Sequence, residues 1–178
     1  MSIRRVKVEV KGVTALLMHR FPIEPIEAIE KKTPQEQAEV AAYRTPEGGL
    51  YVPAVCIQRA LISAAAFSKG KGRASLQRNA AACLMIEPEC VDLGVKAFAV
   101  DSRAVVVPAT KGRVVRHRPR IDAWALAFSV DFDDSLLRET ELRRIVDDAG
   151  QRVGLLDFRP EKRGMFGRFM VTSWANGQ

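Results

Sequence analysis

The two histidines of the sequence are the first candidates for acid–base chemistry, because histidine titrates near neutral pH. His19 follows an apolar segment and precedes Arg20, whereas His117 lies inside a basic run. A histidine beside an RNA 2′-hydroxyl can act as a general base, although a lone histidine at a strand end is more often structural or exposed. The sequence contains neither a Gly-x-Ser-x-Gly elbow nor a Gly-Lys-Ser/Thr phosphate loop. We therefore expect no catalytic residue, with His19 as the alternative.

Carboxylates gather at residues 131–134 and 147–148, where a pair could hold a magnesium ion. The second pair lies in a predicted helix, points in directions about 100° apart and has Arg143, Arg144 and Arg152 nearby, which favours surface ion pairs. The first group spans a strand end and a helix start, where acids stabilise the helix dipole. The three cysteines include no Cys-x-x-Cys pair. We expect no metal and no cofactor.

Basic residues are concentrated in three segments, at residues 68–78, 103–120 and 158–168. Together these segments hold half of the 28 lysines and arginines but only one of the 21 acids, Glu161. Each also contains glycine, which allows close approach of a ligand to the backbone and can expose N–H groups to phosphate. One such cluster is equally well a solvated loop. Three of them, in a chain of net charge +7, predict a surface that binds nucleic acid.

The expected contacts are the cations of these segments together with the glycines and the phenylalanine of the last one. Cations supply attraction and counterion release, and the glycines admit a phosphate to the backbone. Phe166, between two glycines, either stacks on a base or plugs the core. The full set is Lys69, Lys71, Arg73, Lys111, Arg113, Arg116, Arg118, Arg159, Lys162, Arg163, Gly164, Phe166, Gly167 and Arg168.

The hydrophobic pattern predicts the strands that must position these residues. Alternation places Trp124, Leu126 and Phe128 on one face of a strand, and Gly12 interrupts another that residues 13–18 can continue. The segment with Asp101 contains one or two strands, split near that residue. The predicted strands are residues 3–10, 80–86, 95–107, 123–130 and 168–174.

Two amphipathic helices are predicted, at residues 54–67 and 135–153. Ser135 or Thr140 is the expected N-cap of the second helix, and Gly154 its terminator. The order strand, helix, strands, helix, strand is that of a ferredoxin-like βαββαβ unit of the α+β class, with an antiparallel sheet and both helices on one face.

The chain of 178 residues is expected to form a single domain. Residues 20–49 contain four prolines and one short predicted helix, which indicates an insertion or projecting segment. No apolar run approaches the roughly 20 residues that cross a bilayer, and the start of the sequence alternates rather than forming a signal peptide. The cysteines lie in apolar surroundings, as buried thiols in a reducing compartment do. We expect a cytoplasmic protein with no membrane partner.

Two motifs resemble the repeat-associated RAMP superfamily, whose members build CRISPR effector complexes. Residues 164–168, Gly-Met-Phe-Gly-Arg, are similar to the Gly-Phe-Gly-Arg with which the family's glycine-rich loop ends before its final strand, with one residue added. Residues 50–61 are similar to the family's Tyr-Ile-Pro-Gly-Ser-Ser-Leu-Lys-Gly-Ala-Leu-Arg segment between a strand and a helix. Here alanine, glutamine, arginine and isoleucine replace the usual residues at Ala54, Gln58, Arg59 and Ile62.

This resemblance implies a modified RRM-like fold and a small backbone-type subunit that binds guide RNA and assembles side by side along it, alone or with other effector subunits. It also implies that residues 20–49 form a projection such as the thumb of backbone subunits. We therefore expect a non-catalytic guide-RNA-binding subunit of a CRISPR-like antiviral effector, or of a related phage or mobile-element complex. The alternatives are a metal-independent endoribonuclease using His19, as guide-processing relatives use a histidine, and a phage-type single-stranded DNA-binding or annealing protein.

Overall fold

A four-stranded antiparallel sheet forms the centre of the computed structural model, which describes residues 2–70 and 74–177. Its strand order is β4-β8-β1-β9, and two helices connect the strands. This is the ferredoxin-like arrangement predicted from the sequence. The core elements are β1 (Ile3–Gly12), α3 (Ala54–Ala64), β4 (Met85–Glu87), β8 (Ala125–Asp133), α5 (Glu139–Asp148) and β9 (Phe169–Asn176).

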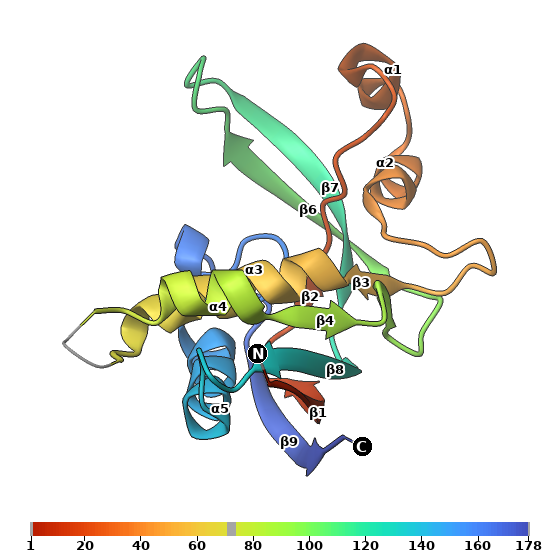
Figure 1. Cartoon of the computed structure of the whole chain (residues 1–178). Helices are drawn as coiled ribbons and strands as arrows, with labels where there is room; N and C mark the ends of the chain where they lie inside the picture. The colour runs from red at the N-terminus through yellow and green to blue at the C-terminus, as the bar shows by residue number, and fades with distance from the viewer. Residues whose placement is uncertain (1, 71–73, 178) are drawn as a thin grey trace.

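Helices α3 and α5 cover one face of this sheet (Figure 1). Alternate residues of β1, Val6, Val8 and Val10, point into the core, where β8 contributes Leu126 and Phe128. Burying such side chains contributes about 1.5–3 kcal/mol each. The inward face predicted for β8 is therefore confirmed.

The opposite face of the sheet is open. Lys7, Glu9 and Lys11 of β1 lie there beside Ala125 and Ala127 of β8. Among the strand residues that the structure describes, this face carries no aromatic side chain. It therefore lacks the rings on which RRM-type sheets stack bases.

A second sheet, of order β2-β7-β6, extends away from the core. Strands β6 (Ala99–Val106) and β7 (Arg113–Ile121) form a long hairpin, hereafter the arginine hairpin, which projects upward in Figure 1. Strand β2 (Leu16–Leu17) pairs with the base of β7. The chain therefore leaves the first sheet after Gly12 instead of continuing β1. Strands β3 (Tyr51–Pro53) and β5 (Cys90–Asp92) make a separate pair.

Residues 20–49, expected to be an insertion, contain α1 (Ile26–Glu30) and α2 (Pro34–Ala41). Thr33 caps α2, accepting a hydrogen bond from the Glu36 N–H, and Glu36 bonds back to the Thr33 N–H. Both helices lie beside the arginine hairpin in Figure 1.

Several predicted boundaries were wrong. The apolar run at 80–86 is divided between α4 (Gln77–Cys83) and β4, because consecutive alanines favour a helix that periodicity alone cannot distinguish from a buried strand. The segment around Asp101 is one unbroken strand, the first of the two alternatives, and its partner is Arg113–Ile121, for which no strand was predicted.

The second predicted helix begins later than expected. Its N-cap is Arg138, whose N–H donates to the Glu141 side chain at 2.9 Å, while Ser135 donates to Asp133 instead of capping. Its end is a π-helical turn, Ala149–Val153, followed by Gly154 at φ +75°, which confirms Gly154 as the terminator. Short 3₁₀ turns occupy Ala65–Phe67 and Pro160–Lys162.

Candidate nucleic-acid interface

The register of the arginine hairpin places four arginines on one face. Side chains alternate along a strand, so Arg116, Arg118 and Arg120 of β7 share a face. Arg103 of β6 lies directly opposite Arg116, and Asp101 lies opposite Arg118, on the same face. The predicted basic cluster is therefore a row of cations on a regular strand pair.

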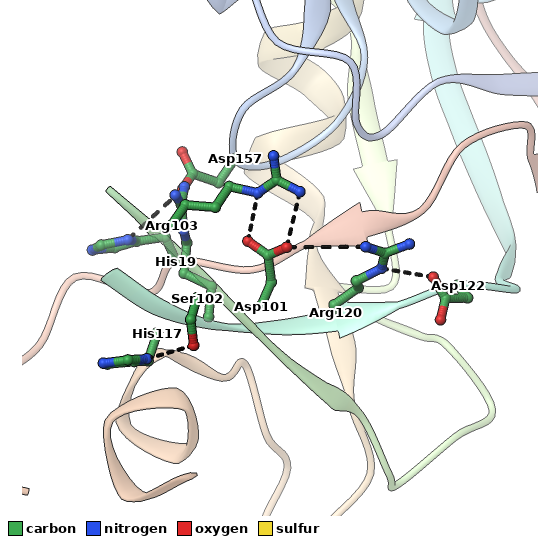
Figure 2. A network of polar contacts seen from close by, with 9 residues as sticks. His19, Asp101, Ser102, Arg103, His117, Arg120, Asp122 and Asp157 are labelled. Atoms are coloured by element: carbon green, nitrogen blue, oxygen red, sulfur yellow. Dashed lines mark hydrogen bonds and ion pairs between the residues drawn. The ribbon is translucent and has the colours of Figure 1, made fainter. Parts of the chain in front are cut away.

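One buried carboxylate organises this row. Asp101 is only 7% exposed and accepts two hydrogen bonds from Arg103, from Nε at 2.7 Å and Nη2 at 3.0 Å. Arg120 approaches the same carboxylate at 4.0 Å and donates to Asp122 at 2.7 Å. Figure 2 shows Arg103 and Arg120 converging on Asp101 from either side. A bidentate contact of this kind fixes a guanidinium plane.

The loop that faces this row, residues 154–168, is termed the glycine loop. Its N–H groups are used within the protein: Gly164 donates to the Arg159 carbonyl at 2.9 Å and Phe166 to the Phe158 carbonyl at 3.1 Å. Gly167 donates to the Ala15 carbonyl at 2.8 Å, outside the loop. Donors that are already bonded cannot form an anion-binding concavity. The expected phosphate cradle at Gly164 and Gly167 is not formed by this backbone.

Both positions instead require glycine for steric reasons. A β-carbon on Gly164 would overlap the carbonyl group of Phe158, and one on Gly167 would overlap the carbonyl oxygen of Leu155. Gly167 also has φ +74°, where a side chain is strained. The glycines thus let two stretches of the loop pack against each other.

The ring of Phe166 is buried, so Phe166 plugs the core and its ring cannot stack on a base. It lies 5.9 Å from the ring of Phe158, and the Arg103 guanidinium lies over both rings, at 4.7 Å and 5.7 Å from their centroids. The loop therefore supports an arginine of the hairpin through cation–π contacts.

Arg118 also departs from its expected place on the surface. It is 3% exposed and forms an ion pair with Asp157 of the glycine loop. Its Nε and Nη2 groups have no hydrogen-bond acceptor among the described residues. A guanidinium in this position joins the hairpin to the loop rather than reaching a phosphate.

His19 lies at the same junction, with Nδ1 3.8 Å from the Asp157 carboxylate. Burial lowers the pKa of His19 from its ordinary value of 6.5; the Asp157 charge opposes this, and the charges of Arg118 and Arg116 reinforce it. His19 is therefore neutral at physiological pH. His117, the other histidine, accepts or donates a 2.7 Å hydrogen bond with Ser102 on the opposite face of the hairpin. Both histidines border a cavity of about 60 Å³ beneath α1 and α2.

The remaining predicted cations differ in whether they are bonded to another group of the protein. Lys111, Arg113 and Arg116 of the hairpin have no ion-pair partner within the described part of the chain, and neither do the exposed Lys162 and Arg163. Two others are bonded within the protein: Arg159 to Glu161 at 2.7 Å, and Arg168 to the Gln151 carbonyl at 2.6 Å. Among these predicted cations, the ones without an ion pair in the described structure therefore lie on the hairpin and at the turn around residue 162.

The third predicted cluster is separate. Lys69 is exposed and follows the 3₁₀ turn at the C-terminal end of α3. This end of α3 lies away from the hairpin tip in Figure 1. Lys71 and Arg73 lie outside the described residues. The structure therefore brings together two of the three basic segments.

The acids that hold the site together were missed by sequence reasoning. Asp101 interrupts an otherwise apolar and small-residue stretch, where the sequence left one strand or two open and assigned the acid no role. A lone acid in such a stretch, followed by an arginine-rich segment with alternate spacing, is a signal for a buried ion pair. Asp157 has no comparable signal, because its partner lies 39 residues away.

No helix among residues 2–70 and 74–177 is long and apolar enough to span a bilayer. No protein-family model and no curated protein matches the sequence.

A solved structure does match. It is a chain of the cryo-EM structure of the Type III-B Cmr-beta bound to cognate target RNA, with 11% sequence identity and a TM-score of 0.57. The match covers 98% of this chain and 61% of that chain, so this protein spans about three fifths of its neighbour's length. The protein therefore shares its fold with a Cmr-beta chain, in agreement with the family resemblance of its two motifs.

Proposed function

We propose that this chain is a non-catalytic, RNA-binding subunit of a CRISPR-like effector or a related phage or mobile-element complex, and that its ligand is guide RNA. The observation that carries the proposal is the arginine hairpin, a projection whose exposed Lys111 and Arg113 and half-buried Arg116 have no acidic partner in the described structure. Unpaired cations on a projecting element attract phosphate and release counterions when they bind it.

The fold supports this proposal, because the matching Cmr-beta structure is bound to target RNA. The open face of the central sheet, without aromatic rings among its described residues, argues against base recognition there. Backbone contacts by the hairpin are the alternative that remains, and they suit a subunit that binds RNA irrespective of sequence.

Side-by-side assembly has a candidate surface in the segment that leads into α1. Phe21 and Ile23 are 86% and 90% exposed, and Ile26 is more than half exposed. Adjacent exposed apolar side chains are typical of interaction sites. We propose that this segment contacts a neighbouring copy or another effector subunit.

The proposal predicts a strong salt dependence of RNA binding. Replacing Lys111, Arg113 and Arg116 together by alanine should reduce the slope of log K against log salt by about two, since each lost single-strand phosphate contact removes about 0.7. Thermal unfolding should change little, because none of the three cations has an ion-pair partner in the described structure and surface charge substitutions usually alter stability by less than about 0.5 kcal/mol. Fluorescence anisotropy with labelled RNA between about 50 and 200 mM salt measures the slope.

The matched control replaces Lys7 and Lys11, two exposed cations of the open sheet face, by alanine. We expect this variant to retain most of the wild-type slope. An equal or larger loss in the control would move the interface to the sheet. Competition with single-stranded DNA of the same sequence tests the annealing-protein alternative, which requires that DNA compete at least as well as RNA.

Metal-independent RNA cleavage is a second candidate function, favoured by the contact between His19 and Asp157. A neutral His19 could accept a 2′-hydroxyl proton, and the nearby Asp157 carboxylate would stabilise the imidazolium that forms. Cleavage of labelled RNA in the presence of a chelator should then increase with pH and level off once His19 has lost its proton. Because burial lowers the pKa of His19, this plateau should begin below pH 6.5, the ordinary pKa of histidine. Cleavage that is lost in His19→Ala with binding retained would establish this function. Intact RNA at every pH supports the non-catalytic proposal.

A further inference from the structure

We propose that the exposed face of the Arg103 guanidinium is a stacking platform for one unpaired RNA base. The inference rests on the proposed RNA-binding function and adds to it a base subsite beside the phosphate contacts. It follows from three properties of this side chain: the hydrogen bonds along one edge of the guanidinium, the aromatic rings that support one of its faces (the back), and the exposure of the other face (the front).

The edge of the guanidinium is occupied by Asp101. Nε and Nη2 both donate to this buried carboxylate, at 2.7 Å and 3.0 Å. These are two of the donors that arginine uses to grip a phosphate in a forked geometry, and the adjacent negative charge offsets the positive one. Arg103 is therefore poorly suited to bind a phosphate, although its plane is held in a fixed orientation.

The back of the guanidinium rests on the glycine loop. Its distances to the Phe166 and Phe158 centroids, 4.7 Å and 5.7 Å, are similar to the 5.9 Å between the two rings. The guanidinium therefore packs against both rings of this aromatic pair. The side chain remains 35% exposed, and we infer that the exposed part is the guanidinium face turned away from the two rings. Figure 2 shows Arg103 standing above the strands of the hairpin.

A planar cation with a free face is complementary to a nucleobase, since arginine stacks on bases exposed in single-stranded RNA. The neighbouring residue supplies the rest of a nucleotide site. Arg116 lies opposite Arg103 on the same face of the strand pair, where side chains are adjacent, and it has no ion-pair partner in the described structure. Arg116 would bind the phosphate and Arg103 the base, without discrimination among the four bases.

The test compares wild type with Arg103→Lys, which keeps the charge and removes the plane. Affinity is measured for an unstructured RNA and for a series of the same RNA with one abasic position each. We expect Arg103→Lys to bind intact RNA roughly tenfold more weakly, as loss of one base stack does, with an unchanged salt slope. An abasic position in register should weaken wild type by a similar factor and leave Arg103→Lys unaffected.

Arg44→Lys is the matched control. Arg44 also pairs with a carboxylate, Glu39 at 3.0 Å, and also lies over an aromatic ring, that of Phe98 at 5.5 Å, but outside the hairpin. This variant should bind RNA like wild type. Arg103→Gln, with a planar neutral amide, is a second variant if Arg103→Lys unfolds, and it should retain part of the abasic effect.

A fluorescent base analogue placed in register should be quenched by wild type but not by Arg103→Lys. Equal abasic penalties in wild type and Arg103→Lys, or equal affinities for intact RNA, would overturn the platform while leaving backbone binding intact. Absence of RNA binding by wild type would instead overturn the proposed function, so the two failures are distinguishable.

Discussion

Replacing Asp157 by alanine is expected to lower the free energy of unfolding by about 3 kcal/mol. The substitution removes the only acidic partner described for Arg118, a guanidinium that is almost wholly buried and already has two N–H groups without a protein acceptor in the described structure. An unpaired buried charge is far more costly than the loss of the pair itself. Because Asp157 is partly exposed, water can reach the site and holds the cost at the lower end of the usual range.

Chemical denaturation measures this effect, and two further variants define its origin. Asp122→Ala breaks another arginine–aspartate contact, with Arg120, but both side chains are exposed, so the expected change is about 1 kcal/mol or less. Combining Asp157→Ala with Arg118→Met should restore most of the lost stability, because an apolar side chain no longer needs a partner. A double variant as unstable as Asp157→Ala would show that Asp157 stabilises the fold by another route.

Alanine at Gly164 or Gly167 should also destabilise the protein, by about 2–4 kcal/mol each. In both cases the added β-carbon meets a backbone carbonyl, which cannot rotate away as a side chain does. Gly167 bears the further cost of its positive φ. Denaturation midpoints at constant m-value give the change in stability.

Gly112→Ala, in the hairpin turn, is the control for this pair. Its β-carbon would meet only the Thr110 hydroxyl at 3.3 Å, so a change below about 1 kcal/mol is expected. RNA affinity per folded molecule should be unchanged in all three variants, since the N–H groups of both loop glycines are bonded within the protein. Normal stability with lost affinity would restore the phosphate cradle expected from the sequence.

Local patterns in the sequence were sufficient to predict the ferredoxin-like core. The alternation of β1 and β8, the amphipathic stripes of α3 and α5, and the helix terminator Gly154 each depend on near neighbours in the chain. The error at α4 has the same origin, because a run of alanines and leucine contains no information about the element that will cover it. The family resemblance of residues 50–61 and 164–168 agreed with the resulting order of elements.

The candidate site was predictable in residue type but not in arrangement. The acid-free run 103–120 indicated a cationic surface, yet the burial of Arg118 depends on which arginine of the row the glycine loop meets. Sequence alone does not specify that choice, since the arginines two residues apart in β7 have identical side chains. Asp101 and Asp157 could be assigned only after the register and the loop were known.

The position of β1 in the sheet has a consequence for how the chain reaches its native state. Strand β1 lies between β8 and β9, and the Thr172 hydroxyl donates to the Glu9 carbonyl across 163 residues of sequence. Contacts of such high sequence separation must form against a large loop-closure entropy, which slows folding. During synthesis Val6, Val8 and Val10 remain without one neighbouring strand until the last strand has emerged from the ribosome. We therefore expect the nascent chain to depend on chaperones or on early RNA capture longer than a helical protein of equal length.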